Sequence, residues 1–209
     1  METATRSSYH HGDLRTALVE IGLELTRAGG PDALRLREAT RRTGVTARAA
    51  YRHFADRDAL LAAVAARIQD KMAQSMRERM DDGESDDSVD RVIARLRDLG
   101  LGYVEFALDE PGWFQVAFFA PDGIVRPDGR TPPPLELLRE ALDALVGSGL
   151  LSAERRIGAE WSCWSTVHGF AELAIHGPLQ GEGRADLRLL ASQAVDDVIA
   201  GICRGAGTS

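Results

Sequence analysis

Apolar residues recur every three or four positions along most of this chain, which is the spacing of amphipathic α-helices. The first such stretch covers residues 13–28 and ends at Gly29-Gly30-Pro31, a sequence that stops a helix. Further helical stretches begin near residues 36, 46, 56, 88, 135, 152 and 187. No segment of any length alternates apolar and polar residues as a strand does. The pattern therefore predicts an all-α fold of about nine helices.

Residues 35–54 are expected to form two short helices joined by a tight turn at Gly44. Thr46 is placed to cap the second helix through its hydroxyl group. Ala50 and Phe54 lie four residues apart on one face of that helix, which we expect to be buried. The opposite face carries Ala47, Arg48, Tyr51 and Arg52. This face is either a solvated surface or, as its arginine and tyrosine side chains favour, a surface that enters a DNA major groove.

A longer motif runs through this helix pair into the next helix. Gly-Val-Thr at 44–46 is followed by Tyr-x-His-Phe at 51–54, Arg57 and Leu-Leu at 60–61. Together with Arg37, this motif resembles the N-terminal domain of the TetR (tetracycline-repressor) family of bacterial transcriptional regulators. Thr40 departs from the family pattern, which usually has Ala there, and Arg52 stands where an aromatic residue is common. The resemblance covers residues 12–72, with the helix-turn-helix at 35–54.

The resemblance implies a homodimeric, ligand-responsive transcriptional regulator, most simply a repressor, that binds a palindromic operator in double-stranded DNA. Arg48 is expected to read a base edge, Tyr51 and Arg57 to hold phosphates, and Arg52 to do either. His53 is either structural or a phosphate contact. The full set of expected DNA-binding residues is Arg37, Thr46, Ala47, Arg48, Tyr51, Arg52, His53 and Arg57.

Residues 81–88 are rich in Asp, Gly and Ser, and are expected to form a linker before a C-terminal effector-binding and dimerisation domain at 84–205. Trp164-x-x-x-His168-Gly169 resembles a C-terminal class found in part of the family, which implies that the last two long helices pair with their copies in a second subunit. The resemblance to the TetR family implies that an unknown small molecule binds this domain and shifts the helix at 56–80.

Aromatic residues gather in the C-terminal half, where they form either plain core or the walls of the ligand pocket. The expected pocket residues are Tyr103, Phe106, Trp113, Phe114, Phe118, Trp161, Trp164 and His168. His168, Cys163 and Gln115 are candidate polar anchors, although each alone is more simply a satisfied core residue. Met72, Met76 and Met80 form a stripe that is either core or an adaptable pocket edge.

Charge is divided unevenly along the chain. The first 60 residues contain ten Arg and eight Asp or Glu, a net charge of +2. Since the whole chain has a net charge of −7, residues 61–209 carry −9. A basic end on an acidic body favours DNA contact through that end alone. No apolar run is long enough to span a membrane, so we expect a cytoplasmic protein.

Catalysis finds little support in the sequence. There is no GxSxG, phosphate-binding glycine loop or HExxH motif, and His10-His11 is a weak metal candidate, so no cofactor or metal is expected. Cys163 and Cys203 are expected to be free buried thiols. Two alternatives to a regulator remain: a small-molecule-binding or scaffolding dimer without DNA binding, and an enzyme that uses His168 and Cys163.

Overall fold

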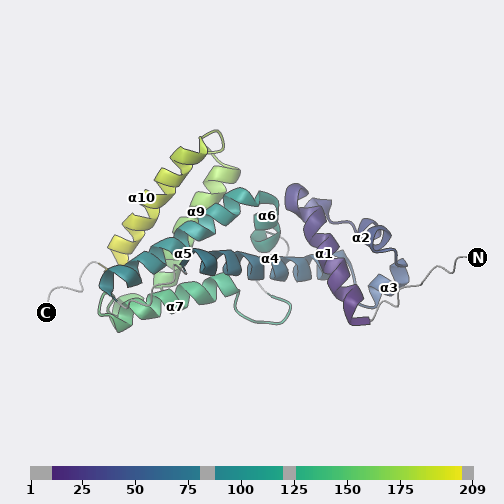
Figure 1. The fold of residues 1–209 in the computed structure, drawn as a ribbon, viewed down its shortest axis with the longest axis horizontal. Helices are drawn as coiled ribbons and strands as arrows, with labels where there is room; N and C mark the ends of the chain where they lie inside the picture. The colour runs from purple at the N-terminus through teal and green to yellow at the C-terminus, as the bar shows by residue number, and fades with distance from the viewer. Residues whose placement is uncertain (1–10, 81–87, 120–125, 204–209) are drawn as a thin grey trace, which may run out of the picture. The chain divides into compact units, whose positions relative to one another are not determined.

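The computed structural model describes residues 11–80, 88–119 and 126–203, and for residues 11–13 and 119 the backbone alone. Within these ranges the chain forms ten α-helices and one short 3-10 helix, without a strand, which confirms the all-α prediction (Figure 1). The elements are α1 (His11–Gly29), η1 (Pro31–Ala33), α2 (Leu36–Thr43), α3 (Ala47–Tyr51), α4 (Arg57–Met80), α5 (Val89–Asp109), α6 (Pro111–Phe119), α7 (Pro133–Gly147), α8 (Ala153–Arg156), α9 (Ala159–Ile175) and α10 (Arg184–Cys203). The expected linker at 81–88 lies outside the described residues except for Ser88.

The chain divides into two compact units, and the boundary between them falls inside α4. The first unit contains residues 1–68 and 112–128, and the second contains residues 69–111 and 129–209. The long helix α4 is therefore continuous in the chain from one unit to the next. Nearly all of α6 belongs to the first unit, whereas the sequence placed this aromatic segment in the C-terminal domain.

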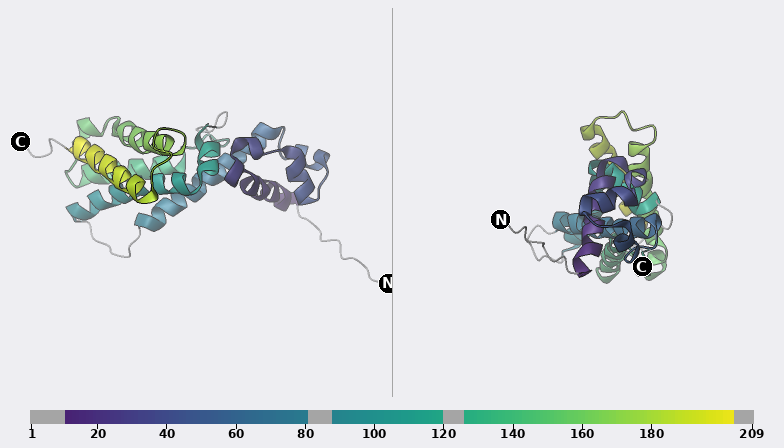
Figure 2. Two further views of the ribbon diagram at one scale, coloured as in Figure 1. Left: turned by 90° about the horizontal axis from the view of Figure 1, so that it is seen from above. Right: turned by 90° about the vertical axis from the view of Figure 1, so that its right-hand side faces the viewer.

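In the first unit, α1 packs against α2 and α3, as two further views show (Figure 2). The core of this unit is built from apolar side chains of its helices and of the segment before α2. Leu18, Leu34 and Leu60 are fully buried, and Phe54 is 3% exposed. The guanidinium carbon of Arg15 lies 5.1 Å from the centre of the Phe54 ring, which adds a cation–π contact between α1 and the end of the helix-turn-helix.

The helix α6 is attached closely to the C-terminal end of α1. A Cβ atom at Gly112 would lie 2.6 Å from the Thr26 carbonyl oxygen, so only glycine permits this approach. The Nε1–H group of Trp113 donates a hydrogen bond of 2.8 Å to the Leu23 carbonyl oxygen. The guanidinium carbon of Arg27 lies 5.2 Å from the centre of the Trp113 ring. This contact binds α6 to the helix that supports the helix-turn-helix.

The second unit is built around α5, α7, α9 and α10, which pack on one another. The sequence predicted one helix from Ser152 onward, but the structure has two. The Ser152 side chain caps α8 by accepting a hydrogen bond of 3.3 Å from the Arg155 backbone N–H. The chain then turns at Gly158, whose φ of 78° interrupts the helix before α9 begins.

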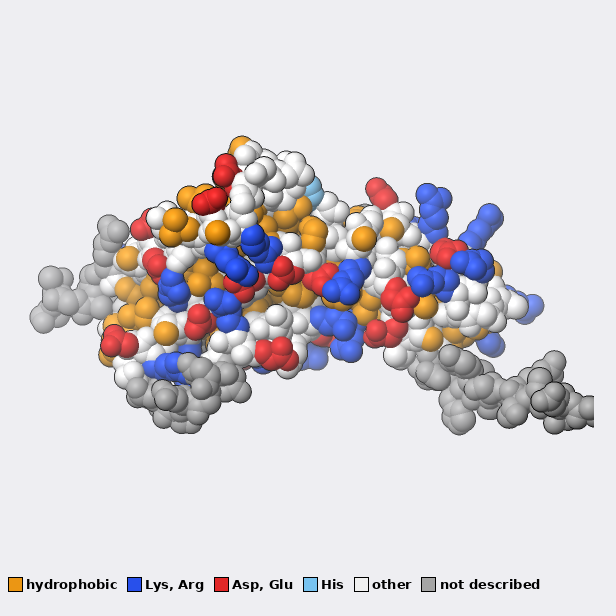
Figure 3. Space-filling model, turned by 45° about the horizontal axis from the view of Figure 1, so that its top comes forward, with side chains coloured by type: hydrophobic (Ala, Val, Ile, Leu, Met, Phe, Trp, Pro, Cys, Tyr) orange, Lys and Arg blue, Asp and Glu red, His pale blue; other side chains and the backbone are white. Residues whose placement is uncertain are grey.

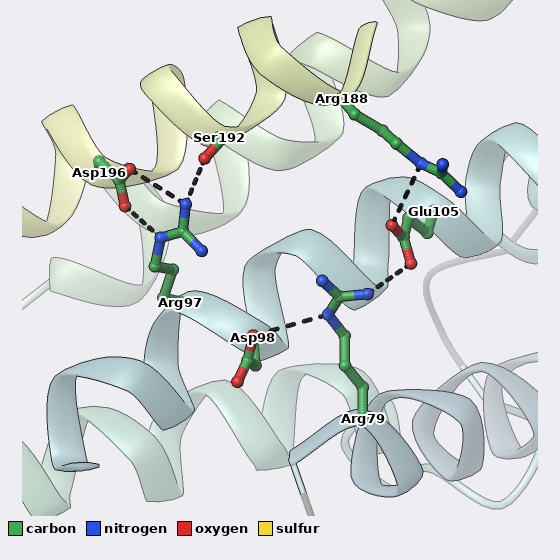
Figure 4. A network of polar contacts seen from close by, with 7 residues as sticks. All are labelled: Arg79, Arg97, Asp98, Glu105, Arg188, Ser192 and Asp196. Atoms are coloured by element: carbon green, nitrogen blue, oxygen red, sulfur yellow. Dashed lines mark hydrogen bonds and ion pairs between the residues drawn. The ribbon is translucent and has the colours of Figure 1, made fainter. Parts of the chain in front are cut away.

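A polar network joins the last turn of α4 to α5 and α10 within the second unit (Figure 4). Arg79 on α4 bonds to the Glu105 carboxylate at 2.6 Å and lies 3.7 Å from Asp98, both on α5. The other oxygen of Glu105 lies 3.6 Å from Nε of Arg188 on α10. A second pair, Arg97 on α5 and Asp196 on α10, is joined at 2.6 Å. These contacts fix the register of the three helices.

Candidate functional site

The turn before α3 has the geometry that the sequence predicted. Gly44 ends α2 with a φ of 69°, the left-handed conformation that glycine adopts without strain. Its backbone N–H donates to the Arg41 carbonyl oxygen at 3.3 Å. Thr46 then caps α3, because its hydroxyl oxygen accepts a hydrogen bond of 3.2 Å from the Ala49 backbone N–H. The capping role of Thr46 is confirmed.

The two faces of α3 also lie as predicted. Ala50 is fully buried and Phe54 nearly so. Tyr51 is 55% exposed, and the other three residues of the opposite face, Ala47, Arg48 and Arg52, are exposed as well. Figure 3 shows Lys and Arg side chains projecting from the end of the first unit, where α2 and α3 lie. The exposed face of α3 is therefore available to a partner.

The arginines of this region fall into two groups. Arg41 is held by Glu38 at 2.7 Å, and Arg42 by Glu24 at 3.0 Å. The second group comprises Arg37, Arg48 and Arg52, whose side chains have no hydrogen-bonding or ionic partner among the residues that the structure describes. The side chains of Tyr51 and His53 have none within the same residues either. Unpaired donors on one exposed surface are suited to phosphate oxygens and base edges.

The phosphate contact that the resemblance implied for Arg57 stays a prediction, and the structure shows where this side chain bonds within the protein. Its Nε donates to the Leu34 carbonyl oxygen at 2.8 Å, Nη2 donates to the Pro31 carbonyl oxygen, and Nη1 lies 3.1 Å from the Asp58 carboxylate. Three of the five N–H donors of the guanidinium are therefore used inside the protein. These contacts bind the start of α4 to the segment between α1 and α2.

Thr40 fits the core of the first unit in spite of its polar group. The side chain is 6% exposed, and its hydroxyl group donates to the Arg37 carbonyl oxygen at 2.8 Å. Because this hydroxyl is satisfied within α2, its burial leaves no unpaired polar group. The departure from the family pattern at this position therefore requires no change in helix packing.

The second unit contains an apolar cavity of about 30 Å³. It is lined by residues of α4, α5, α7, α9 and α10, namely Met76, Leu96, Leu99, Gly100, Tyr103, Pro134, Leu138, Cys163, Trp164, Val167, Val195, Val198 and Ile199. None of these residues carries a charged side chain. A cavity of this composition is suited to an apolar ligand.

The structure separates the residues that were expected to form the ligand pocket. Tyr103 and Trp164 line the cavity, and His168 bonds to Tyr103, while Phe106 is buried without lining it. Trp161 is 56% exposed at the surface of α9. The remaining three, Trp113, Phe114 and Phe118, lie on α6 in the first unit, as does the proposed polar anchor Gln115. These α6 residues do not line the cavity, because α6 packs on α1 instead.

Most cavity residues were missed by the sequence analysis because they are ordinary aliphatic residues of four different helices. Helical spacing indicated that several of them are buried, but nothing in the spacing showed that the buried faces of these helices meet. Met76 was noted only as core or an adaptable pocket edge, and the structure places it in the cavity wall.

The side chains of Tyr103, which lines the cavity, and His168 are hydrogen-bonded to each other. The Tyr103 hydroxyl group and Nδ1 of His168 are hydrogen-bonded at 2.8 Å. Burial raises the pKa of Tyr103 well above its usual value, and burial lowers the pKa of His168 in spite of the nearby Glu172 carboxylate. Both groups are therefore neutral near pH 7, and the cavity is lined without charge.

The two cysteines are free, as predicted. Cys163 is buried and Cys203 is partly exposed, and burial raises the pKa of the Cys163 thiol to about 11, which disfavours the nucleophilic thiolate. Among the described residues, no three His, Cys, Asp or Glu side chains are grouped so as to hold a metal ion; His10 and the His11 side chain lie outside that set. No helix within the described ranges is long and apolar enough to cross a membrane.

Large apolar side chains are exposed on α9 and α10. Trp161 and Leu173 on α9 are 56% and 46% exposed, and Leu189 and Leu190 on α10 are 58% and 37% exposed. These two helices pack against each other within the second unit. Large apolar side chains that are exposed on neighbouring helices are candidates for a protein–protein interface.

The fold and the exposed α3 face define a helix-turn-helix DNA-binding protein. Residues 18–64 match the family model for "Bacterial regulatory proteins, tetR family", and residues 96–198 match "Tetracyclin repressor-like, C-terminal domain". This chain belongs to the TetR family of transcriptional regulators, with a DNA-binding domain followed by a ligand-binding domain. No curated protein matches the chain. The Trp164-x-x-x-His168-Gly169 class stays a prediction.

Solved structures share the fold at low sequence identity. A protein of unknown function from Rhodococcus sp. RHA1 is 24% identical with a TM-score of 0.73, covering 95% of this chain and 100% of that one. A TetR-family transcriptional regulator from Pectobacterium atrosepticum is 20% identical with a TM-score of 0.66, covering 95% and 98%. A TetR variant from Acinetobacter baumannii, in complex with minocycline, is 19% identical with a TM-score of 0.64, covering 92% and 98%.

Proposed function

We propose that this protein is a transcriptional repressor that binds a palindromic operator as a homodimer and is released from it by a small-molecule effector. The observation that carries the proposal is the exposed face of α3. Arg48, Tyr51 and Arg52 are presented there without partners among the described residues, while Ala50 and Phe54 hold the helix to its core. Arg48 is the residue proposed to read a base edge, since arginine donates two parallel hydrogen bonds to guanine.

A dimer is proposed because α3 has only five residues and can contact few bases. A two-fold pair of such helices reads two half-sites about 34–36 Å apart, or a multiple of that distance. The exposed apolar side chains of α9 and α10 are the proposed dimer interface. Pairing through this surface would bury these apolar side chains and fix the distance between the two α3 helices of the dimer.

The effector is proposed to bind in the cavity of the second unit. Two connections along the chain would carry its effect to the helix-turn-helix. The first is α4, which contributes Met76 to the cavity and Leu60 to the core of the first unit. The second is Glu110, the single residue between the end of α5 and the start of α6. The minocycline complex of the Acinetobacter baumannii protein supports a small organic effector in general, without indicating minocycline for this chain.

The coupling between effector and operator is expected to be modest. A coupling free energy of about 1–3 kcal/mol would weaken operator binding roughly 5- to 150-fold, which is enough for a switch. Because linkage is reciprocal, operator DNA must weaken effector binding by the same factor.

The test is fluorescence anisotropy with DNA from upstream of the protein's own gene and with a scrambled duplex of equal length. Arg48→Ala should weaken operator binding by about 1–3 kcal/mol and leave binding to the scrambled duplex nearly unchanged. Arg41→Ala is the matched control, because Arg41 is exposed in the same domain but held by Glu38. Equal losses on both duplexes for Arg48→Ala would remove Arg48 from base recognition.

A protein that binds neither duplex at any salt concentration would refute the proposal as a whole. That result would favour the alternative function, a small-molecule-binding dimer without DNA binding. Salt must be varied in this experiment, since nonspecific binding to DNA falls steeply as salt concentration rises.

A further inference from the structure

The walls of the cavity restrict the chemistry of its ligand. None of the thirteen lining residues is Lys, Arg, Asp or Glu, and the nearest titratable pair, Tyr103 and His168, is neutral near pH 7. A carboxylate, phosphate or ammonium group placed there would lose its hydration without gaining an ionic partner from the wall. The lining therefore favours ligands that carry no charge.

The aromatic residues of the wall do not form a cage for a cation. The ring centres of Tyr103 and Trp164 are 5.2 Å apart with an angle of 68° between the ring planes, so the two rings meet edge to face. A cation is best held by ring faces that are open toward it. Because one ring's edge contacts its neighbour here, the pair contributes an apolar wall more than a cation site.

The cavity must enlarge before it can hold an organic ligand. Its volume is about 30 Å³, whereas a dry protein cavity that binds benzene measures about 150 Å³, five times as much. Met76 is the only lining residue that comes from α4. Its unbranched thioether side chain changes conformation more easily than the branched and ring side chains around it.

The position of Met76 connects this enlargement to α4. The helices α4 and α5 approach closely at Gly102, where a Cβ atom would lie 3.5 Å from Cα of Met76 and 3.3 Å from Cδ of Arg79. One helical turn of α4 thus contains both a residue of the cavity wall and the arginine that binds Glu105. Any ligand that displaces Met76 acts directly on the last turns of α4.

We propose that the effector is a compact, uncharged and mainly apolar molecule, of the size of a single ring, and that it enters by displacing the Met76 side chain. This inference rests on the proposed function for the choice of site. The nature of the ligand follows from the uncharged wall, and the route follows from the small volume and from the place of Met76 on α4.

Three ring compounds of similar size test the charge of the ligand: benzyl alcohol (neutral), benzoate (anionic) and benzylammonium (cationic). Their dissociation constants for the full-length protein are measured at pH 7 by isothermal titration calorimetry, without DNA. Benzyl alcohol should bind at least about tenfold more tightly than either charged compound. Equal or tighter binding of benzoate or benzylammonium would overturn the proposed ligand class.

Two methionine variants test the route. Met76→Ala removes the wall residue and should tighten benzyl alcohol binding at least about tenfold, because the ligand no longer has to displace a side chain. Met72→Ala is the matched control, since Met72 is fully buried one turn earlier on α4 but does not line the cavity. Circular dichroism checks that each variant is folded, and Met76→Val replaces Met76→Ala if the latter is not.

The results separate this inference from the proposed function. If the two methionine variants bind benzyl alcohol alike, the role of Met76 is wrong. If the wild-type protein and the Met76 variant both fail to bind benzyl alcohol at millimolar concentrations while the protein still binds operator DNA, the ligand class fails and the regulator function stands. If the protein binds no DNA duplex but binds benzyl alcohol more tightly than benzoate and benzylammonium, the proposed ligand class stands and the DNA-binding function fails.

Discussion

Arg57 provides the sharpest test, because the family resemblance implies a phosphate contact, whereas its hydrogen bonds within the protein suggest a contribution to stability. Arg57→Ala removes the donors to the carbonyl oxygens of Leu34 and Pro31. A hydrogen bond from a charged group contributes about 1.5–3 kcal/mol, and the side chain is 38% exposed, which reduces that value. For the two bonds together we expect a loss of roughly 2–3 kcal/mol in the free energy of unfolding.

Urea unfolding followed by circular dichroism measures this loss, and DNA titrations at several salt concentrations measure the other role. A structural Arg57 predicts lower stability with an unchanged slope of log K against log salt. A phosphate-binding Arg57 predicts the reverse, with the slope smaller by about 0.9 for each phosphate that the variant no longer neutralises. Arg37→Ala is the matched control, because Arg37 is exposed and unpaired within the described residues, so its removal should change the slope and leave stability alone.

An Arg57→Ala protein that is as stable as the wild type but has a smaller salt slope would refute the structural role. It would show that the bonds to Leu34 and Pro31 contribute little in solution and that the guanidinium turns toward DNA. Arg57→Lys refines the test, because lysine keeps the charge but cannot reach both carbonyl oxygens as the planar guanidinium does.

Three further predictions concern other residues. Thr46→Ala should lower the free energy of unfolding by about 1 kcal/mol in urea titrations, while Thr46→Ser, which keeps the cap, should not. Trp113→Phe should lower the free energy of unfolding by about 1 kcal/mol by losing the hydrogen bond to Leu23, and a variant as stable as the wild type in the same urea titrations would contradict this. Burial lowers the pKa of His168, so the unfolded chain binds its proton first; stability should therefore fall as pH decreases from about 6.5, and thermal unfolding of His168→Asn should show a flatter pH profile.

The helix-turn-helix could be predicted from sequence because local chemistry determines it. Gly44 and Thr46 specify the turn and the cap, and the spacing of Ala50 and Phe54 specifies which face is buried. Each of these effects acts within a few residues. The bounds of α2 and the two faces of α3 followed from them.

The placement of α6 could not be predicted in this way. Its apolar residues showed only that the segment is buried, and burial against α1 or within the C-terminal half gives the same pattern. What decides the matter is the close approach at Gly112 and the bond from Trp113 to Leu23, a pair 90 residues apart in sequence. Interactions at such separation leave no periodic signal in a single sequence.

The break at Gly158 was missed for another reason. Glycine is tolerated inside many helices, so its presence after Ile157 did not by itself indicate an end. The arginine interactions were missed because a long charged side chain near a chain turn has several possible partners. The carbonyl oxygens that Arg57 reaches are set by the fold and carry no side-chain signature.

The Glu105 carboxylate forms ion pairs with two arginines from different helices (Figure 4). Arg79 contacts one of its oxygens and Arg188 the other. Arg188 lies on α10, which forms part of the proposed dimer interface. Arg79 lies in the last turn of α4, the helix that begins in the DNA-binding domain. A rotation of α10 when two chains associate would move Arg188 relative to Glu105. The electrostatic interaction between Glu105 and Arg79 would change as a result. Oligomerisation and operator affinity would then be thermodynamically linked through a single acidic side chain, even with the ligand cavity empty.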